Sequence, residues 1–286
     1  MVTKKKIDRL EDKLKKHHIT EAELDSVIES SKISRSRTAV LPISREHIKF
    51  GYFSDPHIGH KEFREDGFDK ARRFFKEEKV DFIAVPGDHL EGMTSIPGHI
   101  YELSHIGFQN QINYAASLYN TLDKPIYGID GNHDERYYNK NDAGVIVGEE
   151  LEKRVKNYKH LGQMEGHIKL GNNSDIMLFH PNDRSAFTPG YKLQKLCDSF
   201  TGGDKSSIVL QGHYHKAHYM FYRNIHAYDC GTLSGQSKFM KGKKIQAHMG
   251  FGVVDAYLDK NGVERVINTF VPLYSKERES VKFRKR

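Results

Sequence analysis

The sequence lacks long apolar runs. A membrane-spanning helix needs about eighteen or more consecutive apolar residues, and no such run occurs in the 286 residues. The basic start of the chain, residues 1–13, also lacks the apolar segment of a signal peptide. The composition therefore argues against a transmembrane helix, and we expect a soluble, cytoplasmic protein with no membrane partner.

Cysteine is scarce as well. Cys197 and Cys230 are too few for a disulfide framework, and neither lies in a spacing typical of a metal site. This is consistent with a reducing compartment, and we expect both side chains in the core. With 37% hydrophobic residues in 286, the chain can form one large α/β domain with a sizeable core and some appendages.

Positive charge is unevenly distributed. The chain has a net charge of +7 and a pI of about 9.1, and residues 275–286 contain six basic and two acidic residues. This tail is either a solvated chain end or a counter-charge for a polyanion, because each Lys or Arg placed on a phosphate releases counterions. Charge alone leaves both interpretations open.

Two potential metal ligands follow the first strong strand pattern. Residues 47–53 alternate in polarity and predict a buried strand, and Asp55 and His57 come directly after it. In open α/β sheets, binding sites form at the carboxyl ends of the strands. An oxygen donor and a nitrogen donor at such a position suit a metal ion.

Four more predicted strands end in the same way. The strands cover residues 80–85, 124–129, 175–179 and 208–210. The polar residues that follow them are, in order, Asp88; Asn132, His133 and Asp134; His180; and His213 and His215. One such cluster alone is typical of an ordinary turn, because Asp, Asn and Gly tolerate turn geometry. Five in succession indicate a metal site.

In order and spacing, these clusters resemble the signature of the calcineurin-like metallophosphoesterase superfamily over roughly residues 48–273. The resemblance implies a metallophosphoesterase-type β-sandwich of two mixed sheets flanked by helices. It also implies two ligand sets that share one aspartate. The first set is Asp55, His57, Asp88 and His215, and the second is Asp88, Asn132, His180 and His213.

The family's chemistry uses two divalent cations about 3.5 to 4 Å apart and a hydroxide that bridges them as the nucleophile. The mixed N and O donors suit Mn²⁺, which we expect first, with Fe, Zn²⁺ or Mg²⁺ as alternatives. By resemblance, His133 is the general acid or charge stabiliser at the leaving group, and Asp134 orients its ring. His60, His89 and Lys238 are further candidates for substrate contacts, although each is also consistent with an ordinary exposed polar residue.

The remaining pattern predicts the elements around the site. Apolar residues at helical spacing predict a helix at about residues 65–79, one or two helices at about 99–122, and a further helix from about 143 to 158. From residue 167 onward, short strand patterns extend to residue 271 and predict the second sheet of the sandwich. Residues 198–207 and 234–244 are predicted loops, and the lysines of the second are either solvated or in contact with phosphate.

Residues 1–42 are predicted to form a helical N-terminal arm, ahead of a metallophosphoesterase domain at 43–274 and the basic tail at 275–286. Residues 19–37 resemble the start of a helix-turn-helix segment, in which a recognition helix follows a first helix. Pro42 follows too soon for a full recognition helix. A helical hairpin that docks on a protein partner, or a partly mobile arm, is the alternative.

The functional hypothesis is a dimetal phosphodiesterase that acts on nucleic acid, with DNA favoured over RNA, as an exonuclease or endonuclease. The motif combination is similar in style to the nuclease subunits of DNA-repair complexes and to related phosphodiesterases. One alternative is a phosphoesterase for a small substrate: a cyclic nucleotide, a nucleotide or a protein phosphate. A non-catalytic scaffold on the same fold is a weaker alternative, because every expected metal position is filled.

Overall fold

The computed structural model describes residue 20 and residues 36–41, 46–138, 144–171, 174–202 and 205–274. The chain divides into two compact units, residues 1–35 and 36–286, and every strand and helix in the described ranges belongs to the second unit. The predicted N-terminal helices, nearly all of the helix-turn-helix-like segment and the basic tail lie outside the described residues. The division into an arm, a domain and a tail therefore stays a prediction.

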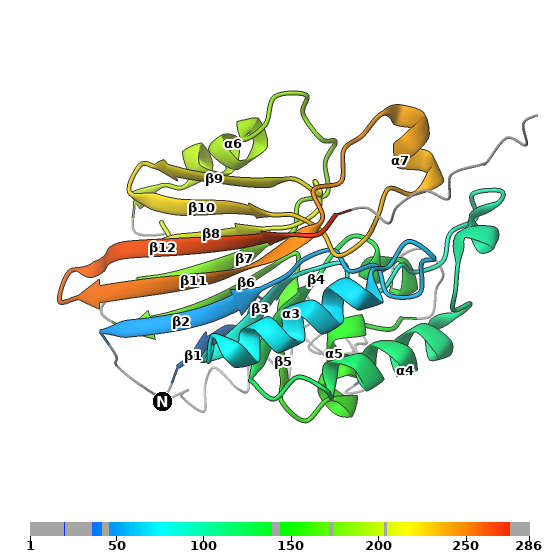
Figure 1. Cartoon of the computed structure of the whole chain (residues 1–286), viewed down its shortest axis with the longest axis horizontal. Coiled ribbons are helices and arrows are strands. Elements are labelled where there is room, and N and C mark those ends of the chain that lie inside the picture. Colours follow the sequence, from blue (N-terminus) through cyan, green and yellow to red (C-terminus); the bar gives the residue numbers. More distant parts are fainter. Residues whose placement is uncertain are drawn as a thin grey trace, which may run out of the picture. The chain divides into compact units, whose positions relative to one another are not determined.

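The first sheet has six strands in the order β12-β11-β2-β3-β4-β5 (Figure 1). Four strands run parallel to one another: β2 (His47–Tyr52), β3 (Phe82–Pro86), β4 (Ile126–Asp130) and β5 (Tyr158–Gln163). The hairpin β11 (Gly250–Asp259) and β12 (Gly262–Pro272) adds to β2 in antiparallel pairing. All five residues of β3 are buried, because a central parallel strand is covered on both faces.

The second sheet has the order β1-β6-β7-β8-β10-β9 and mixes parallel and antiparallel pairs. Its strands are β1 (Thr38–Val40), β6 (Glu165–Gly171), β7 (Ser174–Phe179), β8 (Ile208–Gln211), β9 (Ala217–Tyr222) and β10 (Ile225–Cys230). The predicted sandwich of two mixed sheets is thus confirmed.

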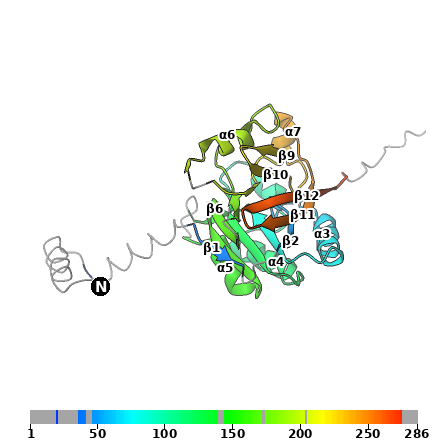
Figure 2. The ribbon, with the colours of Figure 1, turned by 90° about the vertical axis from the view of Figure 1, so that its left-hand side faces the viewer.

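Helices cover the outer faces of both sheets (Figure 2). They are α3 (Glu65–Glu77), α4 (Phe108–Tyr119), α5 (Val147–Arg154) and α6 (Tyr191–Ser199). The short helix α7 (Lys238–Lys243) and the 3₁₀ turns η1 (His99–Glu102) and η2 (Asp134–Tyr137) lie in connections between strands. Apolar residues of α3, α4 and α5 pack on the first sheet, and those of α6 pack on the second. No helix in the described ranges is both long enough and apolar enough to cross a membrane.

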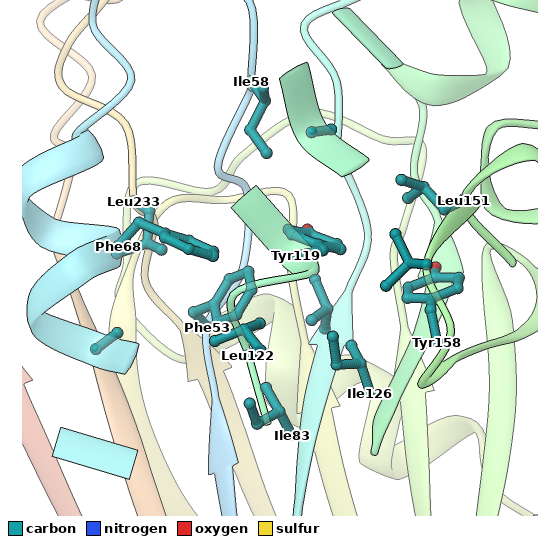
Figure 3. Close-up of a cluster of buried hydrophobic side chains, with 14 of the residues drawn as sticks. Phe53, Ile58, Phe68, Ile83, Tyr119, Leu122, Ile126, Leu151, Tyr158 and Leu233 are labelled. Carbon is teal, nitrogen blue, oxygen red and sulfur yellow. The ribbon is translucent and has the colours of Figure 1, made fainter. Parts of the chain in front are cut away.

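The packing between the first sheet and its helices shows why the helices form where they do (Figure 3). Phe68, Ala71 and Phe75 of α3 recur at helical spacing, and all three are buried. The rings of Phe68 and Tyr119 stack with 6.0 Å between their centroids. A separate cluster of buried residues fills the space between the two sheets. Burial of these apolar side chains supplies most of the stabilisation of the helices.

Two predictions about the elements were wrong. The helix predicted at 143–158 ends at Arg154, because Val155 is extended and Tyr158 begins β5. The strands after residue 167 do not all belong to the second sheet, since the β11–β12 hairpin pairs with β2 of the first sheet. Periodicity identifies a strand but carries no information about the sheet that it joins.

Several elements were not expected, among them β5, α6 and β9 and two short ones within segments predicted as arm or loop. Strand β1 lies within the predicted arm and pairs with β6. Helix α7 lies within the predicted loop at 234–244. It begins there because Ser237 caps it, with its side chain accepting the Met240 N–H, and because Met240 is buried.

We predict a pH-dependent contribution to stability from His167 on β6. Its Nδ1 lies 2.9 Å from Asp175 Oδ2 and its Nε2 lies 3.1 Å from Glu165 Oε1, and hydrogen bonds to these carboxylates raise the pKa of His167 to about 9. The stabilisation is therefore fully present below the ordinary pKa of 6.5 and is lost as the pH rises through about 9.

The variant His167→Gln is expected to unfold with about 1 kcal/mol less free energy than the wild type below pH 6.5, and the difference should vanish above pH 9. Urea titrations of both proteins across this range measure it. A difference that stays constant with pH would contradict the assignment.

Candidate metal centre

The predicted ligands come together where strands of both sheets end. Loops after β2, β3 and β4 carry Asp55, His57, Asp88 and Asn132, and loops after β7 and β8 carry His180, His213 and His215. Parallel strands bring their carboxyl ends to one edge of a sheet. Here the edges of two sheets meet, so one centre draws side chains from five strand ends.

The backbone at this edge is strained. Of the ten non-glycine residues with positive φ in the described part of the chain, five are predicted ligands: Asp55, His57, Asp88, His213 and His215, with φ between 48° and 77°. Each such conformation costs on the order of 1–3 kcal/mol and is typical of functional sites. Backbone contacts between the loops hold it, such as those from Asp55 N to Gly87 O at 3.3 Å and from His57 N to Asp88 O at 3.1 Å.

The first group of donors surrounds the side chain of His57. Its Nε2 lies 3.0 Å from His215 Nε2, 3.8 Å from Asp88 Oδ2 and 4.0 Å from Asp55 Oδ1. His215 Nε2 is in turn 3.3 Å from Asp55 Oδ1. Asp55, Asp88 and His57 are buried. The structure therefore brings together all four residues of the first predicted set.

The second group shares Asp88. Asp88 Oδ2 lies 3.3 Å from His180 Nε2, which is 3.1 Å from Asn132 Oδ1. The Asn132 oxygen is also 2.8 Å from His213 Nδ1. The two groups together suggest a dimetal site in which Asp88 belongs to both halves. Whether these side chains bind metal stays a proposal.

The chemistry of the donors fits divalent cations. Burial lowers the pKa of His57 to about 4 and that of His213 to about 4, so both rings are neutral, the form that binds a metal. Burial alone would raise the pKa of Asp88, but attraction to His180 and His133 lowers it well below its usual range. Two Nε2 atoms 3.0 Å apart beside two carboxylates converge on one point, as ligands of a shared cation do.

Close backbone approach confines the shared carboxylate. A methyl group added at Gly131 would collide with Asp88 Oδ1 and lie 2.7 Å from His180 Cε1. The Asp88 Oδ1 atom accepts the His133 N–H at 2.8 Å. The loop after β4 therefore fixes the position of the Asp88 side chain, which the loop after β3 carries.

Glu91 is a site residue that was missed in the sequence. Its buried carboxylate lies 3.0 Å from His57 Nδ1, 3.3 Å from His133 Nδ1, 2.8 Å from His99 Nε2 and 3.1 Å from Arg136 Nη1. A carboxylate behind a metal-binding imidazole fixes its orientation and raises its basicity. The only signal was its position three residues after Asp88 in the same loop, and the contacts that define its role come from distant parts of the chain.

The expected role of Asp134 was wrong. Its carboxylate accepts the backbone N–H groups of His89 at 3.0 Å, Leu90 at 2.9 Å and Gly131 at 2.9 Å. These bonds tie the loop after β3 to the loop after β4.

The ring of His133 is held by other partners. Its Nδ1 lies 3.0 Å from the Glu91 carbonyl oxygen, and its Nε2 lies 2.8 Å from Arg136 Nη2. Glu91 and Arg136 therefore orient His133, in place of Asp134.

The three predicted substrate contacts differ in their surroundings. His89 is fully buried between the hydroxyl groups of Tyr119 and Tyr158, each 2.8 Å from a ring nitrogen, so its prediction as a substrate contact was wrong. His60 is buried as well, with Nε2 3.3 Å from Glu102 Oε2. Lys238 is exposed on α7, and its contact with substrate stays a proposal.

The family model for calcineurin-like phosphoesterases matches residues 48–268. A DNA polymerase II small subunit from Methanothermobacter thermautotrophicus is 26% identical over 234 residues, 66% of this chain and 48% of its own length. A second such subunit, from Archaeoglobus fulgidus, is 32% identical over 96 residues, 29% of this chain and 20% of its own. The chain thus spans about half the length of the first relative, and less of the second.

Solved structures with similar folds include an archaeal phosphodiesterase, with a TM-score of 0.47 and 14% identity, over 78% of this chain and all of that one. Vacuolar protein sorting 29 from Cryptosporidium parvum has a TM-score of 0.43 and 16% identity, over 79% of this chain and 99% of that one.

We predict that Asp88→Asn removes both metal ions. The wild type is expected to retain two manganese ions per chain after equilibration and desalting, as in a two-metal site, and the variant fewer than one, because the shared carboxylate is lost from both groups. Elemental analysis measures the content. Asp69→Asn, on the exposed face of α3, is the matched control. Full occupancy in Asp88→Asn would rule out the shared role.

Proposed function

Because the chain belongs to the calcineurin-like phosphoesterase family, we propose that it is a metal-dependent phosphodiesterase that cleaves nucleic acid, with DNA favoured. The observation that carries the proposal is the pair of donor groups that share Asp88. The two relatives named as DNA polymerase subunits and the pI of about 9.1 support nucleic acid as the substrate.

The two donor groups would each hold one divalent ion. Asp55, His57, Asp88 and His215 would hold the first, and Asp88, Asn132, His180 and His213 the second. Such ions, when bound, supply activation of water and neutralisation of charge on the phosphate. We expect Mn²⁺, with Fe, Zn²⁺ and Mg²⁺ as alternatives that metal replacement would distinguish.

His133 would act at the leaving group. Its ring centroid is 4.4 Å from that of His57, and its side chain is partly exposed, so substrate can reach it. An arginine only donates hydrogen bonds. The Nε2 that faces Arg136 is therefore an acceptor, and the ring proton lies on Nδ1, toward the Glu91 carbonyl.

Arg136 would then be the cation that meets the incoming phosphate. One of its Nη atoms is anchored on the Glu91 carbonyl at 2.7 Å and on the Glu91 carboxylate at 3.1 Å, which leaves the guanidinium aimed at His133. A planar guanidinium suits phosphate recognition. Transfer of Arg136 from the His133 nitrogen to a phosphate oxygen would free the Nε2 lone pair, which would take up a proton from water and then donate it to the leaving oxygen.

We predict that the wild type with Mn²⁺ cleaves DNA, and that rates fall steeply with salt because phosphate contacts release counterions. His133→Ala should lower the rate about 10²- to 10⁴-fold with metal content unchanged. The assay compares single-stranded DNA, duplex DNA, RNA, a cyclic nucleotide and a generic diester. His47→Ala, at the amino end of β2, is the control. Turnover confined to cyclic nucleotides or mononucleotides, at rates independent of salt, would refute the nuclease proposal.

We also predict that Glu91 supports metal binding as well as activity. Glu91→Gln removes the charge that faces His57, His99 and Arg136, and losses of about 10- to 100-fold in metal affinity or activity are typical when such a partner is removed. Manganese titration and rate measurements test this together. Glu78→Gln, which removes an ion pair with Lys49, should change neither. Unaltered metal affinity and rate in Glu91→Gln would show that its position is incidental.

A further inference from the structure

Large apolar side chains are exposed beside the metal centre. Tyr101 and Ile100 of η1 are 79% and 46% exposed, and Phe239 of α7 is 66% exposed. Hydrogen bonds link η1 to α7 and to the loop after β2, which carries Lys61. The Lys238 N–H lies 3.3 Å from Glu102 Oε2, and Lys61 Nζ lies 2.7 Å from the Tyr101 carbonyl oxygen. We call the surface formed by Lys61, Ile100, Tyr101, Lys238 and Phe239 the rim surface.

The rim surface is tied to the metal centre by short contacts. His99, at the start of η1, lies 2.8 Å from the Glu91 carboxylate, which lies 3.0 Å from His57 Nδ1. The Ser104 N–H donates to Gly59 O at 2.8 Å, in the loop that carries Asp55 and His57. Helix α7 lies at the end of the sheets where β2 finishes (Figure 1). A chain bound on the rim surface would therefore lead directly to the predicted ligands.

Charge on the rim surface identifies the kind of partner. Lys61 and Lys238 of the rim surface are exposed, as are Lys243 and Lys244 at the end of α7, while Lys241 of α7 pairs with Glu62 at 3.1 Å. Protein–protein interfaces are depleted of lysine at their cores. Aromatic rings interleaved with lysines are instead typical of surfaces that bind unpaired nucleic acid, where bases stack on the rings and phosphates contact the basic groups.

We propose that the rim surface binds single-stranded nucleic acid and guides it to the metal centre, an inference that rests on the proposed nuclease function. Unpaired bases stack on Tyr101 and Phe239, and the phosphates between them contact Lys61 and Lys238. In a duplex the faces of the bases are stacked on neighbouring bases and are not accessible to side chains, so the rim surface selects single strands. The enzyme therefore acts on strand ends, gaps or unpaired stretches in preference to intact duplex.

The test is the affinity of the full chain for a fluorescent single-stranded oligonucleotide, measured by anisotropy without divalent ions so that no cleavage occurs. Tyr101→Ala and Phe239→Ala should each weaken binding roughly tenfold, as expected for the loss of one stacked base. Tyr101→Phe should restore it. Lys61→Gln and Lys238→Gln should each reduce the slope of log affinity against log salt by about 0.7.

Controls separate this inference from the proposed function. Tyr219→Ala and Phe221→Ala remove exposed aromatic rings on β9 and should leave binding unchanged, and thermal unfolding confirms that every variant is folded. Equal binding by wild type, Tyr101→Ala and Phe239→Ala, or equal affinity for duplex and single strand, would overturn the inference while the nuclease proposal stands. A wild type that cleaves a generic diester but binds no oligonucleotide would overturn both.

Discussion

One buried carboxylate organises the centre. Asp88 lies within 3.8 Å of His57 Nε2 and 3.3 Å of His180 Nε2, so it belongs to both groups of donors. An isolated buried anion is costly, and the His133 N–H and neighbouring imidazoles offset that cost in the structure. Its position depends on a left-handed backbone at Asp88 and on the absence of a side chain at Gly131. The rest of the site is arranged around this constraint.

The two-sheet sandwich explains how the fold holds the Asp88 carboxylate in this position. The donors lie on loops, but each loop starts at the end of a buried strand, and the loops brace one another through Asp134 and through backbone bonds between Asp55, His57 and the β3 loop. Packed cores on both sides of each sheet hold the strand ends at fixed separations. Strain at five donor residues is therefore supported by the fold, and the donor groups are pre-organised.

The sequence predicts the part of this centre that is local. Each of the following donors comes directly after an apolar strand: Asp55, His57, Asp88, His180, His213 and His215. Their convergence therefore follows from sheet topology. Glu91, the burial of His89 and the role of Asp134 depend on partners far along the chain, such as Arg136, Tyr158 and Leu90. For the same reason the helix predicted at 143–158 was extended past its true end at Arg154, and the β11–β12 hairpin was assigned to the wrong sheet. Local sequence patterns predict the helices and strands, whereas tertiary contacts determine which of them are neighbours.

The proposed function combines the two donor groups, the contacts of Glu91 and Arg136 that position His133, and the rim surface. The two donor groups depend on the shared aspartate. Anomalous diffraction from crystals soaked in manganese tests this most directly. We predict two anomalous peaks about 3.5 to 4 Å apart, with one Asp88 oxygen or both in contact with the two ions. A single peak, or two peaks that Asp88 does not join, would contradict it.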